Sequence, residues 1–305
     1  MAATALKPFL PGVSPDVYGA ADFKAVAELV YSVSGNVLPE GKAMLVYSRL
    51  ALLVRETNTS TFANFVELIR NDAAVQARAV AALTTNHTFF YRESHHFEHF
   101  ERVARPDIVR RLNIGQPVRI WSAGCSSGEE TWSLVLTLLG IDRLEGRRLA
   151  QRNLRVLASD IAPHALRKAQ AGIYPAKDMA AVPSDLVQLW TENQGDTVSM
   201  GKVARSIVRF RSLNLMGDWP ITTKFDVIFC RNVMIYFDGP TKERLIDRFA
   251  KALVPGGHLY IGQSERVTGP AAANLEPVGP TIYRRRTARA YELRSSMIPP
   301  PCAPS

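Results

Sequence analysis

The sequence predicts an α/β fold, namely a parallel, doubly wound sheet that follows a small helical unit. From about residue 117, short apolar runs alternate with helix-like segments, which is the pattern of βαβ units. Residues 16–90 instead show only the three-to-four-residue apolar spacing of helices. With 305 residues, of which 47% are hydrophobic and 21% charged, the chain is large and apolar enough to bury a core.

The N-terminal unit is expected to consist of four helices. Apolar side chains recur at helical spacing at Phe23, Val26, Ala27 and Val30, and again at Phe62, Phe65, Val66 and Ile69. Ser60 is the expected cap of the second set, and the polar stretches 39–41 and 58–60 separate helices. A further helix, from near Ser94 to just before Asn113, joins this unit to the rest.

The α/β part is expected to begin with a strand at 118–121. Further strands are predicted at 154–159, 225–230, 258–262 and 281–285. Helices are predicted at 129–139, from Pro163 onward, and at 241–253, where Pro255, Gly256 and Gly257 follow. The polar stretch 190–214, with alternating residues at 206–210, indicates an inserted hairpin or small antiparallel patch.

These patterns divide the chain into successive parts. We expect an N-terminal extension (1–15), a helical domain (16–90), a linker helix (91–116), an α/β domain (117–286) with an insert at about 190–214, and a Pro-rich, disordered tail (287–305).

Composition excludes several classes of protein. No apolar run approaches the ~20 residues that span a bilayer, and the start of the chain is unlike a secretion signal, so we expect no membrane insertion and a cytoplasmic location. Cys125, Cys230 and Cys302 have no metal-binding spacing, and no metal is expected. His95 and His99 stand four apart, but a solvated or capping histidine cluster is expected because no third ligand lies nearby in sequence.

The net charge of +9 raises the question of nucleic-acid binding. The arginines of the second half are scattered over Arg143, Arg147, Arg148, Arg152, Arg155, Arg205, Arg209, Arg211, Arg284, Arg285 and Arg286. Such scattering suits solvated faces, or an acidic partner surface, at least as well as phosphates. Charge alone does not decide between these alternatives.

The turn after the first strand, WSAGCSSGEE, lies where α/β sheets bind ligands. Gly124 and Gly128 allow a sharp turn, yet the spacing matches neither a dinucleotide fingerprint nor a Walker loop. Glu129 and Glu130 at the helix start would repel a phosphate, so a cationic or neutral ligand such as S-adenosylmethionine fits better. An ordinary strand-to-helix turn remains an equal alternative for this segment alone.

Asp160 ends the second strand. Rossmann-like sheets place there an acid that accepts hydrogen bonds from ribose hydroxyls. Taken alone, the residue is more often a cap of the following helix. The turn and the acid together favour nucleoside binding.

Five motifs carry a family resemblance: LTTNHTFFYRESHHF (83–97), WSAGCSSGEETWSL, LASDIAPHAL, FDVIFCRNVMIYFD (225–238) and LVPGGHLYIGQSE. In this order they closely resemble the CheR family of chemotaxis-receptor glutamate methyltransferases, over about residues 16–286. The resemblance implies a Rossmann-like class I S-adenosylmethionine-dependent methyltransferase domain with a small antiparallel β-subdomain insertion, preceded by a small all-helical N-terminal domain.

The resemblance also implies a set of site residues. The implied cofactor-binding residues are Asn86, Thr88, Arg92, Gly124, Glu130, Asp160, Asn214, Leu215, Arg231 and Asn232. Glu130 would contact the methionine or ribose part of S-adenosylmethionine and Asp160 its ribose. Asn214 and Leu215 would flank the adenine.

The implied reaction moves a methyl group to glutamate carboxylates of methyl-accepting chemotaxis receptors, giving methyl esters and S-adenosylhomocysteine. A glutamate, with a free pKa of about 4.3, is ionised at neutral pH and needs no general base. The enzyme must position two groups and exclude water. Arg92 and Tyr236 are the implied catalytic residues: Arg92 would hold a carboxylate, of substrate or cofactor, and Tyr236 would orient the substrate or border the sulfonium.

The implied partner is the cytoplasmic domain of such a receptor. In some family members the β-subdomain also docks a peptide from the receptor's carboxyl end. We expect a monomer. We also expect no nucleic-acid binding, because the Asn/Asp-Pro-Pro-Tyr/Phe motif of base-methylating enzymes is absent at 231–234. A third alternative, a cofactor-binding signalling module without catalysis, is disfavoured by the retention of Arg92 and Tyr236.

Overall fold

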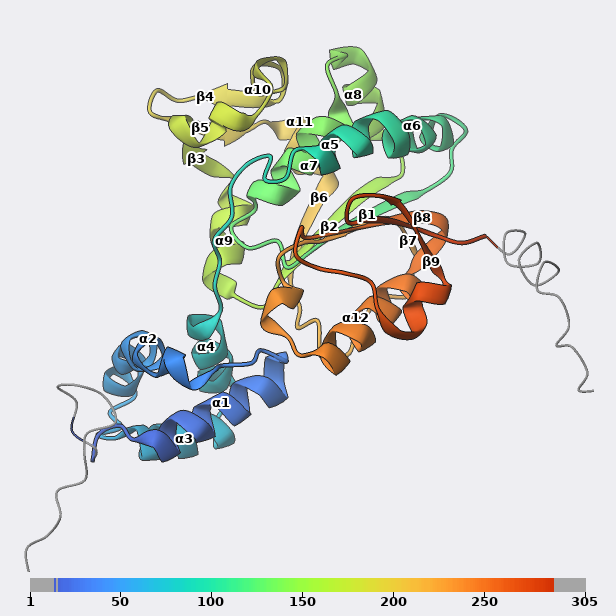
Figure 1. The fold of residues 1–305 in the computed structure, drawn as a ribbon. Coiled ribbons are helices and arrows are strands. Elements are labelled where there is room, and N and C mark those ends of the chain that lie inside the picture. The colour runs from blue at the N-terminus through green and yellow to red at the C-terminus, as the bar shows by residue number, and fades with distance from the viewer. Residues whose placement is uncertain (1–13, 15, 288–305) are drawn as a thin grey trace, which may run out of the picture.

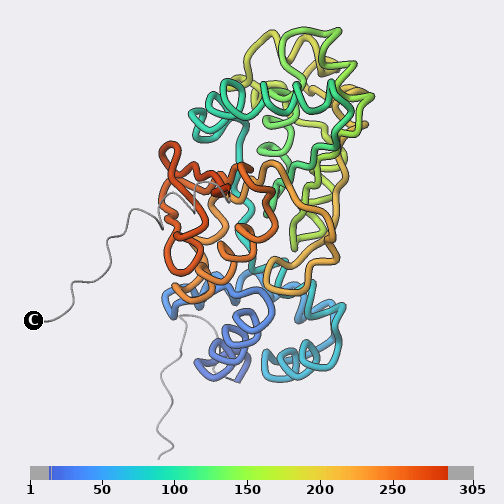
Figure 2. Tube along the Cα trace, turned by 90° about the vertical axis from the view of Figure 1, so that its right-hand side faces the viewer, coloured from blue at the N-terminus to red at the C-terminus, as the bar shows by residue number. Residues whose placement is uncertain are grey.

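The computed structural model describes residue 14 and residues 16–287. The expected N-terminal extension, almost all of the expected tail, and Cys302 therefore lie outside the described residues. Figures 1 and 2 show a helical unit at one end, a sheet with its helices in the middle and a small second sheet at the other end. Within the described part, no helix is both long and apolar enough to cross a membrane.

The helical unit contains the four expected helices, α1 (Ala20–Ser34), α2 (Ala43–Glu56), α3 (Phe62–Asn71) and α4 (Ala73–Leu83), with a 3-10 turn η1 (Glu40–Lys42). They enclose an apolar core of their own, built on buried side chains such as Phe23, Phe62 and Phe65. The cap of α3 is Thr61 rather than Ser60, because its hydroxyl accepts the backbone N–H of Asn64.

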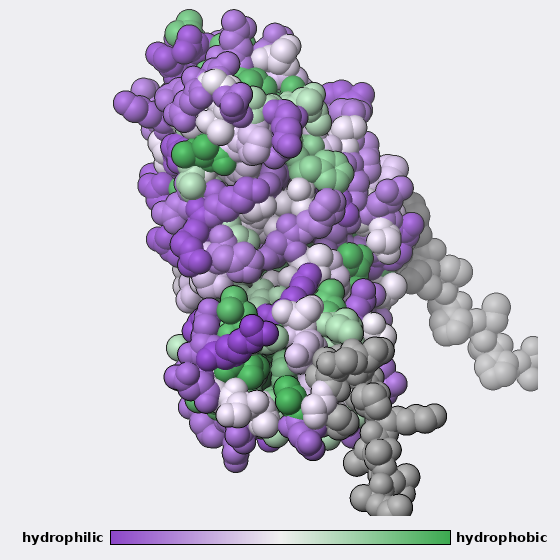
Figure 3. All heavy atoms as spheres, turned by 90° about the vertical axis from the view of Figure 1, so that its left-hand side faces the viewer, coloured by the Kyte–Doolittle hydropathy of each residue, from purple (hydrophilic) through white to green (hydrophobic). Residues whose placement is uncertain are grey.

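The surface of this unit carries exposed apolar side chains. Figure 3, which shows the left-hand side of Figure 1, is mainly hydrophilic, with apolar patches on the lower part and smaller ones above it. Exposed apolar side chains of the helical unit include Met44 and Leu52.

The linker helix runs without a break through α5 (His95–His99), a π-helical turn η2 (Phe100–Ala104) and α6 (Arg105–Asn113), as expected. The π turn stands just before Pro106. Proline has no N–H to donate to the preceding turn, so the backbone hydrogen bonds there shift to a wider spacing. Residues 84–94 carry the chain from α4 to this helix without regular structure.

The main sheet has seven strands in the order β6-β2-β1-β7-β8-β10-β9. The strands are β1 (Val118–Ala123), β2 (Leu154–Asp160), β6 (Val208–Ser212), β7 (Phe225–Cys230), β8 (Leu253–Ile261), β9 (Leu275–Gly279) and β10 (Ile282–Arg285). Strands β6, β2, β1, β7 and β8 are parallel, whereas β10 pairs antiparallel with β8 and β9. The doubly wound α/β fold predicted from the sequence is confirmed.

Each face of the sheet has its own apolar layer. Val118 and Ile120 of β1 pack with the linker helix, α7 (Glu129–Leu139), α8 (Arg143–Gln151) and α11 (Lys202–Ile207). Trp121 and Ala123, on the other face of β1, pack with α12 (Gly239–Ala252) and β7. This alternation of side chains along one strand is what a doubly wound sheet requires. Figure 1 shows the helices above and below the sheet.

The remaining elements of the α/β part follow β2, β7 and β8. After β2 the chain forms α9 (Pro163–Ala171), and short 3-10 segments occur at η4 (Met234–Tyr236) and η5 (Gly269–Ala273). The described part ends with β10 and two further residues.

The small antiparallel sheet consists of β3 (Ile173–Pro175), β5 (Thr197–Met200) and β4 (Thr191–Asn193), with η3 (Ala176–Ala181) and α10 (Ser184–Trp190) between β3 and β4. Its presence is confirmed, but the strand expected at 206–210 lies elsewhere. This stretch forms β6, which pairs parallel with β2 at the edge of the main sheet. The side chains of β6 alternate because no helix of the following connection, residues 213–224, covers one of its faces, so the pattern indicates half-burial and not strand direction.

Candidate active site

A pocket with about 900 Å³ of empty space, its open mouth included, lies beyond the carboxyl ends of β1, β2 and β7. All of the predicted site residues line it: Asn86, Thr88, Arg92, Gly124, Glu130, Asp160, Asn214, Leu215, Arg231, Asn232 and Tyr236. They come from residues 84–94, called the crossing because they lead from the helical unit to the linker helix, from the turn after β1, and from α7. The others come from the end of β2 and from the segments after β6 and β7. The location is where parallel α/β sheets bind ligands.

The helical unit supplies a wall of the pocket that sequence reasoning missed. Ser34 and Asn36, at the end of α1, belong to the lining. Asn36 forms a β-bridge with Phe237, and the Val37 N–H donates to the Tyr236 carbonyl over 2.9 Å. The only sequence signal was the polar triplet at 34–36 after an apolar helix, which also describes an ordinary helix end.

Two glycines shape the turn after β1. Gly124 has φ +78°, and a Cβ there would lie 2.4 Å from a methyl carbon of Val233. Gly128 has φ +97°, and its Cβ would lie 2.8 Å from the Ala169 Cα. Both the left-handed backbone and the close approach therefore require glycine.

Asp160 is nearly buried and holds this turn against the start of α9. Its two oxygens accept the backbone N–H groups of Ser126 at 2.7 Å and Ala162 at 2.9 Å. Burial raises the pKa of Asp160, and these two hydrogen bonds oppose the shift. Because a carboxylate accepts about four hydrogen bonds, the group can cap the turn and still accept from a ligand hydroxyl.

Glu130 and Glu129 have different surroundings. Glu130 lines the pocket, accepts the Ser122 hydroxyl at 2.8 Å and lies 3.5 Å from the Arg231 guanidinium. Burial raises the pKa of Glu130, which the Arg231 charge opposes. Glu129 instead accepts the Ser127 hydroxyl and pairs with Lys168 at 3.2 Å. Glu130 and Asp160 thus make the carboxylate side of the pocket, which suits a cationic ligand and repels phosphate.

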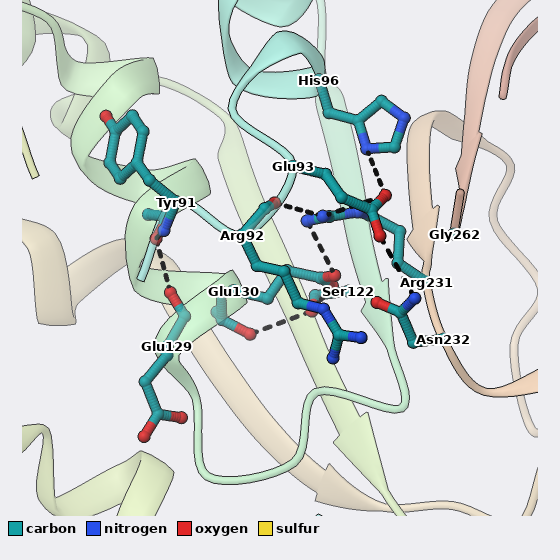
Figure 4. Close-up of polar contacts among 12 residues, drawn as sticks. Tyr91, Arg92, Glu93, His96, Ser122, Glu129, Glu130, Arg231, Asn232 and Gly262 are labelled. Atoms are coloured by element: carbon teal, nitrogen blue, oxygen red, sulfur yellow. Dashed lines mark hydrogen bonds and ion pairs between the residues drawn. The ribbon is translucent and has the colours of Figure 1, made fainter. Parts of the chain in front are cut away.

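Behind the pocket, a buried cluster holds Arg231 and Asn232 (Figure 4). Arg231 lies 3.4 Å from the Glu93 carboxylate and also donates to the Arg92 carbonyl. The Asn232 side-chain amide donates to the other Glu93 oxygen at 3.2 Å. A single carboxylate from the 84–94 crossing therefore fixes two pocket residues that follow β7.

Glu265, which follows β8, holds the segment after β7 that contains Asn232. Its carboxylate accepts the backbone N–H groups of Gly262 at 2.6 Å, Met234 at 2.7 Å and Asn232 at 3.3 Å. Asn232 has φ +58°, an uncommon value for a residue with a side chain. The three hydrogen bonds to Glu265 compensate for that strain.

His96 corrects the expectation of a solvated histidine cluster. It is fully buried, with Nε2 2.9 Å from the Thr281 hydroxyl and Nδ1 3.5 Å from the Glu93 carboxylate. Burial, followed by the Arg231 charge, lowers the pKa of His96 to about 2, so the imidazole is neutral. Within the described residues, no group of three His, Cys, Asp or Glu side chains is arranged to hold a metal.

The two predicted catalytic residues lie at the pocket with different attachments. The Arg92 guanidinium donates to the His87 carbonyl at 3.2 Å and lies 5.6 Å from the Phe89 ring centroid, without an ion pair among the described residues. Its remaining N–H groups are free for a carboxylate. Tyr236 is half-buried in η4, and its carbonyl accepts from Val37 of the helical unit.

Two family models match nearly all of the described chain. The model of the CheR methyltransferase, all-alpha domain, matches residues 21–84. The model of the CheR methyltransferase, SAM binding domain, matches residues 86–282.

Individual proteins agree with these matches. The chain is 42% identical to a probable chemotaxis protein methyltransferase of Rhizobium etli, over 85% of this chain and 97% of that protein. It is 38% identical to chemotaxis protein methyltransferase 2 of Pseudomonas aeruginosa, over 87% of this chain and 93% of that protein. Among solved structures, the N-methyltransferase NodS of Bradyrhizobium japonicum with S-adenosylhomocysteine has 16% identity and a TM-score of 0.31, over 62% of this chain and 88% of that one.

Proposed function

Because this chain belongs to the CheR methyltransferase family, we propose that it methylates glutamate side chains of methyl-accepting chemotaxis receptors. The products are glutamyl methyl esters and S-adenosylhomocysteine. Family membership already makes the chain a chemotaxis methyltransferase that uses S-adenosylmethionine. The proposal concerns the glutamate substrate and the ester product.

The acidic side of the pocket is assigned to the cofactor. Asp160 accepts from the ribose hydroxyls, and Glu130 faces the charged methionine part, while Asn214 and Leu215 border the adenine. This assignment is supported by the free acceptor capacity of Asp160 and by the absence of any phosphate-binding backbone pattern in the 124–128 turn. Asn86, Thr88, Gly124, Arg231 and Asn232 complete this wall.

The observation that carries the proposal is that the Arg92 guanidinium lines the same pocket as Glu130 and Asp160 yet forms no ion pair among the described residues. When bound, S-adenosylmethionine supplies a methyl group on a sulfonium. Arg92 holds the substrate carboxylate at two points and aims one oxygen at that methyl group, and Tyr236 borders the same space. The chain needs no general base, since the carboxylate arrives ionised.

The partner assignments follow from the same function. We infer that the protein acts as a monomer in the cytoplasm on the receptor's cytoplasmic domain, and that the small sheet β3-β5-β4 takes a receptor carboxyl-terminal peptide where a receptor has one. We also keep the proposed division into a helical domain (16–90), a linker helix (91–116) and an α/β domain (117–286).

The test is a transfer assay with methyl-labelled S-adenosylmethionine and membranes that contain receptors. We expect base-labile counts released as methanol, and a loss of at least about a hundredfold in turnover for Arg92→Ala, with a smaller loss for Arg92→Lys. Arg102→Ala, an exposed arginine of the linker helix that does not line the pocket, is the matched control. Cofactor binding without any methanol release across several receptors would exclude the proposed reaction.

A further inference from the structure

Away from the active site, four arginines share one face of the main sheet. Arg119 of β1 and Arg155 of β2 are register partners. Arg209 and Arg211 of β6 stand opposite Leu157 and Ser159 of β2. Because side chains alternate along a strand, this register places all four arginines on the same face.

None of the four arginines forms an ion pair among the described residues. Their guanidinium groups donate only to nearby carbonyls and to Asn153: the Arg119 Nη2 donates to the Asn153 side chain at 2.8 Å, and the Arg155 Nη1 to the Leu154 carbonyl at 2.6 Å. Elsewhere exposed arginines do find acids, as in the Arg110–Asp107 and Arg284–Glu276 pairs.

This arrangement costs free energy in the ligand-free protein. Like charges repel, and here Arg119 and Arg155 are register partners on two parallel strands, with no ion pair to either among the described residues. Each guanidinium also has N–H donors without a partner, in a geometry that matches phosphate. An anion bound across the arginines would remove both deficits.

Beside the arginines lies a hollow with about 880 Å³ of empty space, its opening included. Arg119, Arg155 and Arg211 line it together with the apolar side chains of Leu157, Leu213 and Ile221, and no acidic residue does. The hollow exists because the connection from β6 to β7, residues 213–224, contains no helix and covers this part of the face only as a loop. The site thus combines an apolar floor with a cationic rim.

We propose that this hollow binds a nucleotide with two or more phosphate groups. The phosphates lie against Arg119, Arg155 and Arg211, and the apolar body of the ligand lies on Leu157, Leu213 and Ile221. This site is distinct from the cofactor pocket, whose carboxylates Glu130 and Asp160 repel phosphate. Leu213 lines both cavities, so the bound nucleotide would lie against the segment that carries Asn214 into the cofactor pocket.

The experiment is calorimetric titration of the full chain, saturated with S-adenosylhomocysteine so that the cofactor pocket is filled, in 150 mM NaCl. The probes are ATP, GTP, tripolyphosphate and hexaglutamate. We expect saturable binding of one nucleotide per chain, weakened about tenfold or more in both Arg155→Gln and Arg211→Gln. Arg110→Gln, which removes an equal charge from a paired, exposed arginine, should bind as the wild type does.

Four outcomes would overturn the proposal. Two are the absence of nucleotide binding and unchanged affinity in both Arg155→Gln and Arg211→Gln. The third is tripolyphosphate binding as tightly as ATP, which would assign an inorganic anion only. The fourth is binding of hexaglutamate in place of the phosphate compounds, which would assign an acidic protein partner. None of these outcomes depends on methyl transfer. The nucleotide site can therefore be wrong while the proposed methyl transfer is right, and the methyl transfer can be wrong while the nucleotide site is right.

A stability measurement keeps the test decisive if a variant binds poorly for other reasons. In the ligand-free protein at low salt, Arg155→Gln should raise Tm by about 1–3 °C, since it removes the repulsion with Arg119. The gain should shrink at 0.5 M NaCl, where charges are screened within about 4 Å. A lower Tm at low salt would contradict the repulsion on which the site is argued.

Discussion

At the scale of single residues, the active site depends on side chains that hold other side chains. Arg231 is buried and faces two carboxylates, Glu93 at 3.4 Å and Glu130 at 3.5 Å. Removing one partner from a buried ion pair is usually costly, because the remaining charge has no solvent to replace it. Glu93 is therefore a positioning residue for the cofactor pocket although it does not line it.

Glu93→Ala should weaken S-adenosylhomocysteine binding about tenfold or more, since Arg231 loses one of its two carboxylate partners and the Asn232 amide loses its acceptor. Glu93→Gln keeps one carbonyl acceptor and should lose less. Calorimetry measures the affinities, and circular dichroism checks the fold. The control is Glu101→Ala, an exposed acid in the π-helical turn η2; equal affinities in Glu93→Ala and the wild type would remove Glu93 from this role.

The residues that line the pocket could be predicted from the sequence, whereas the buried residues that hold them in place could not. Every residue inferred from motifs lies in one cavity, and their individual roles stay predictions. Glu93, His96 and Glu265 were missed because a buried charge is recognisable only from its partners, and these come from segments far apart in the chain. In the sequence they are recognisable only as single polar residues within apolar segments.

At the scale of elements, the turn between β1 and α7 is fixed by two glycines with little freedom. A Cβ at Gly128 would meet backbone of α9, and its φ of +97° disfavours any other residue. The turn is therefore packed closely against the last part of α9.

Gly128→Ala should lower the free energy of unfolding by about 2–4 kcal/mol, from the positive φ and the overlap with Ala169. Gly239→Ala, at the start of α12 with nothing within 4 Å of the added Cβ, should change it little. Urea denaturation of the two variants measures the difference. If Gly128→Ala were as stable as Gly239→Ala, the close packing of the turn on α9 would be wrong.

The elements that sequence predicted well are those buried on both faces. Phe225–Cys230 and Glu129–Leu139 were placed to the residue. The helix is bounded by Gly128 and Gly140, both with positive φ, and the strand is a short apolar run. The expected helix 241–253 begins earlier, at Gly239, and its last residue belongs to β8. β3 and β9 were missed: both are short edge strands with a proline, and such segments resemble loops.

At the scale of the whole molecule, stability should depend on pH through buried histidines. Burial lowers the pKa of His96 to about 2 and that of His258 to about 4, so both stay neutral in the folded protein where the unfolded chain protonates, below about pH 6.5. The unfolded state then binds more protons, and the free energy of unfolding falls as the pH is lowered.

We expect the urea midpoint to fall between pH 7 and pH 5, and to fall less steeply in His258→Gln and His96→Gln. The slope is the readout, since each variant also loses packing that lowers stability at every pH. Denaturation at several pH values measures it. Parallel curves for wild type and both variants would show that these imidazoles are protonated in the folded state.

The two ways in which the helical unit joins the α/β part have a mechanical consequence. On one side the connection is covalent, along residues 84–94, and Ala81 of α4 packs there on Ala162 and Ala165. On the other side the end of α1 is held by the Asn36–Phe237 bridge and by hydrogen bonds of Val37 to Tyr236, Tyr31 to Asp238 and Asn214 to Val33. Both sides supply residues that line the cofactor pocket, Asn86 and Arg92 from the first and Asn36 and Tyr236 from the second. A different placement of the helical unit would break these contacts and move Ser34 and Asn36 relative to Tyr236 and Asn214. The shape of the cofactor pocket is therefore set by how the two units are held together.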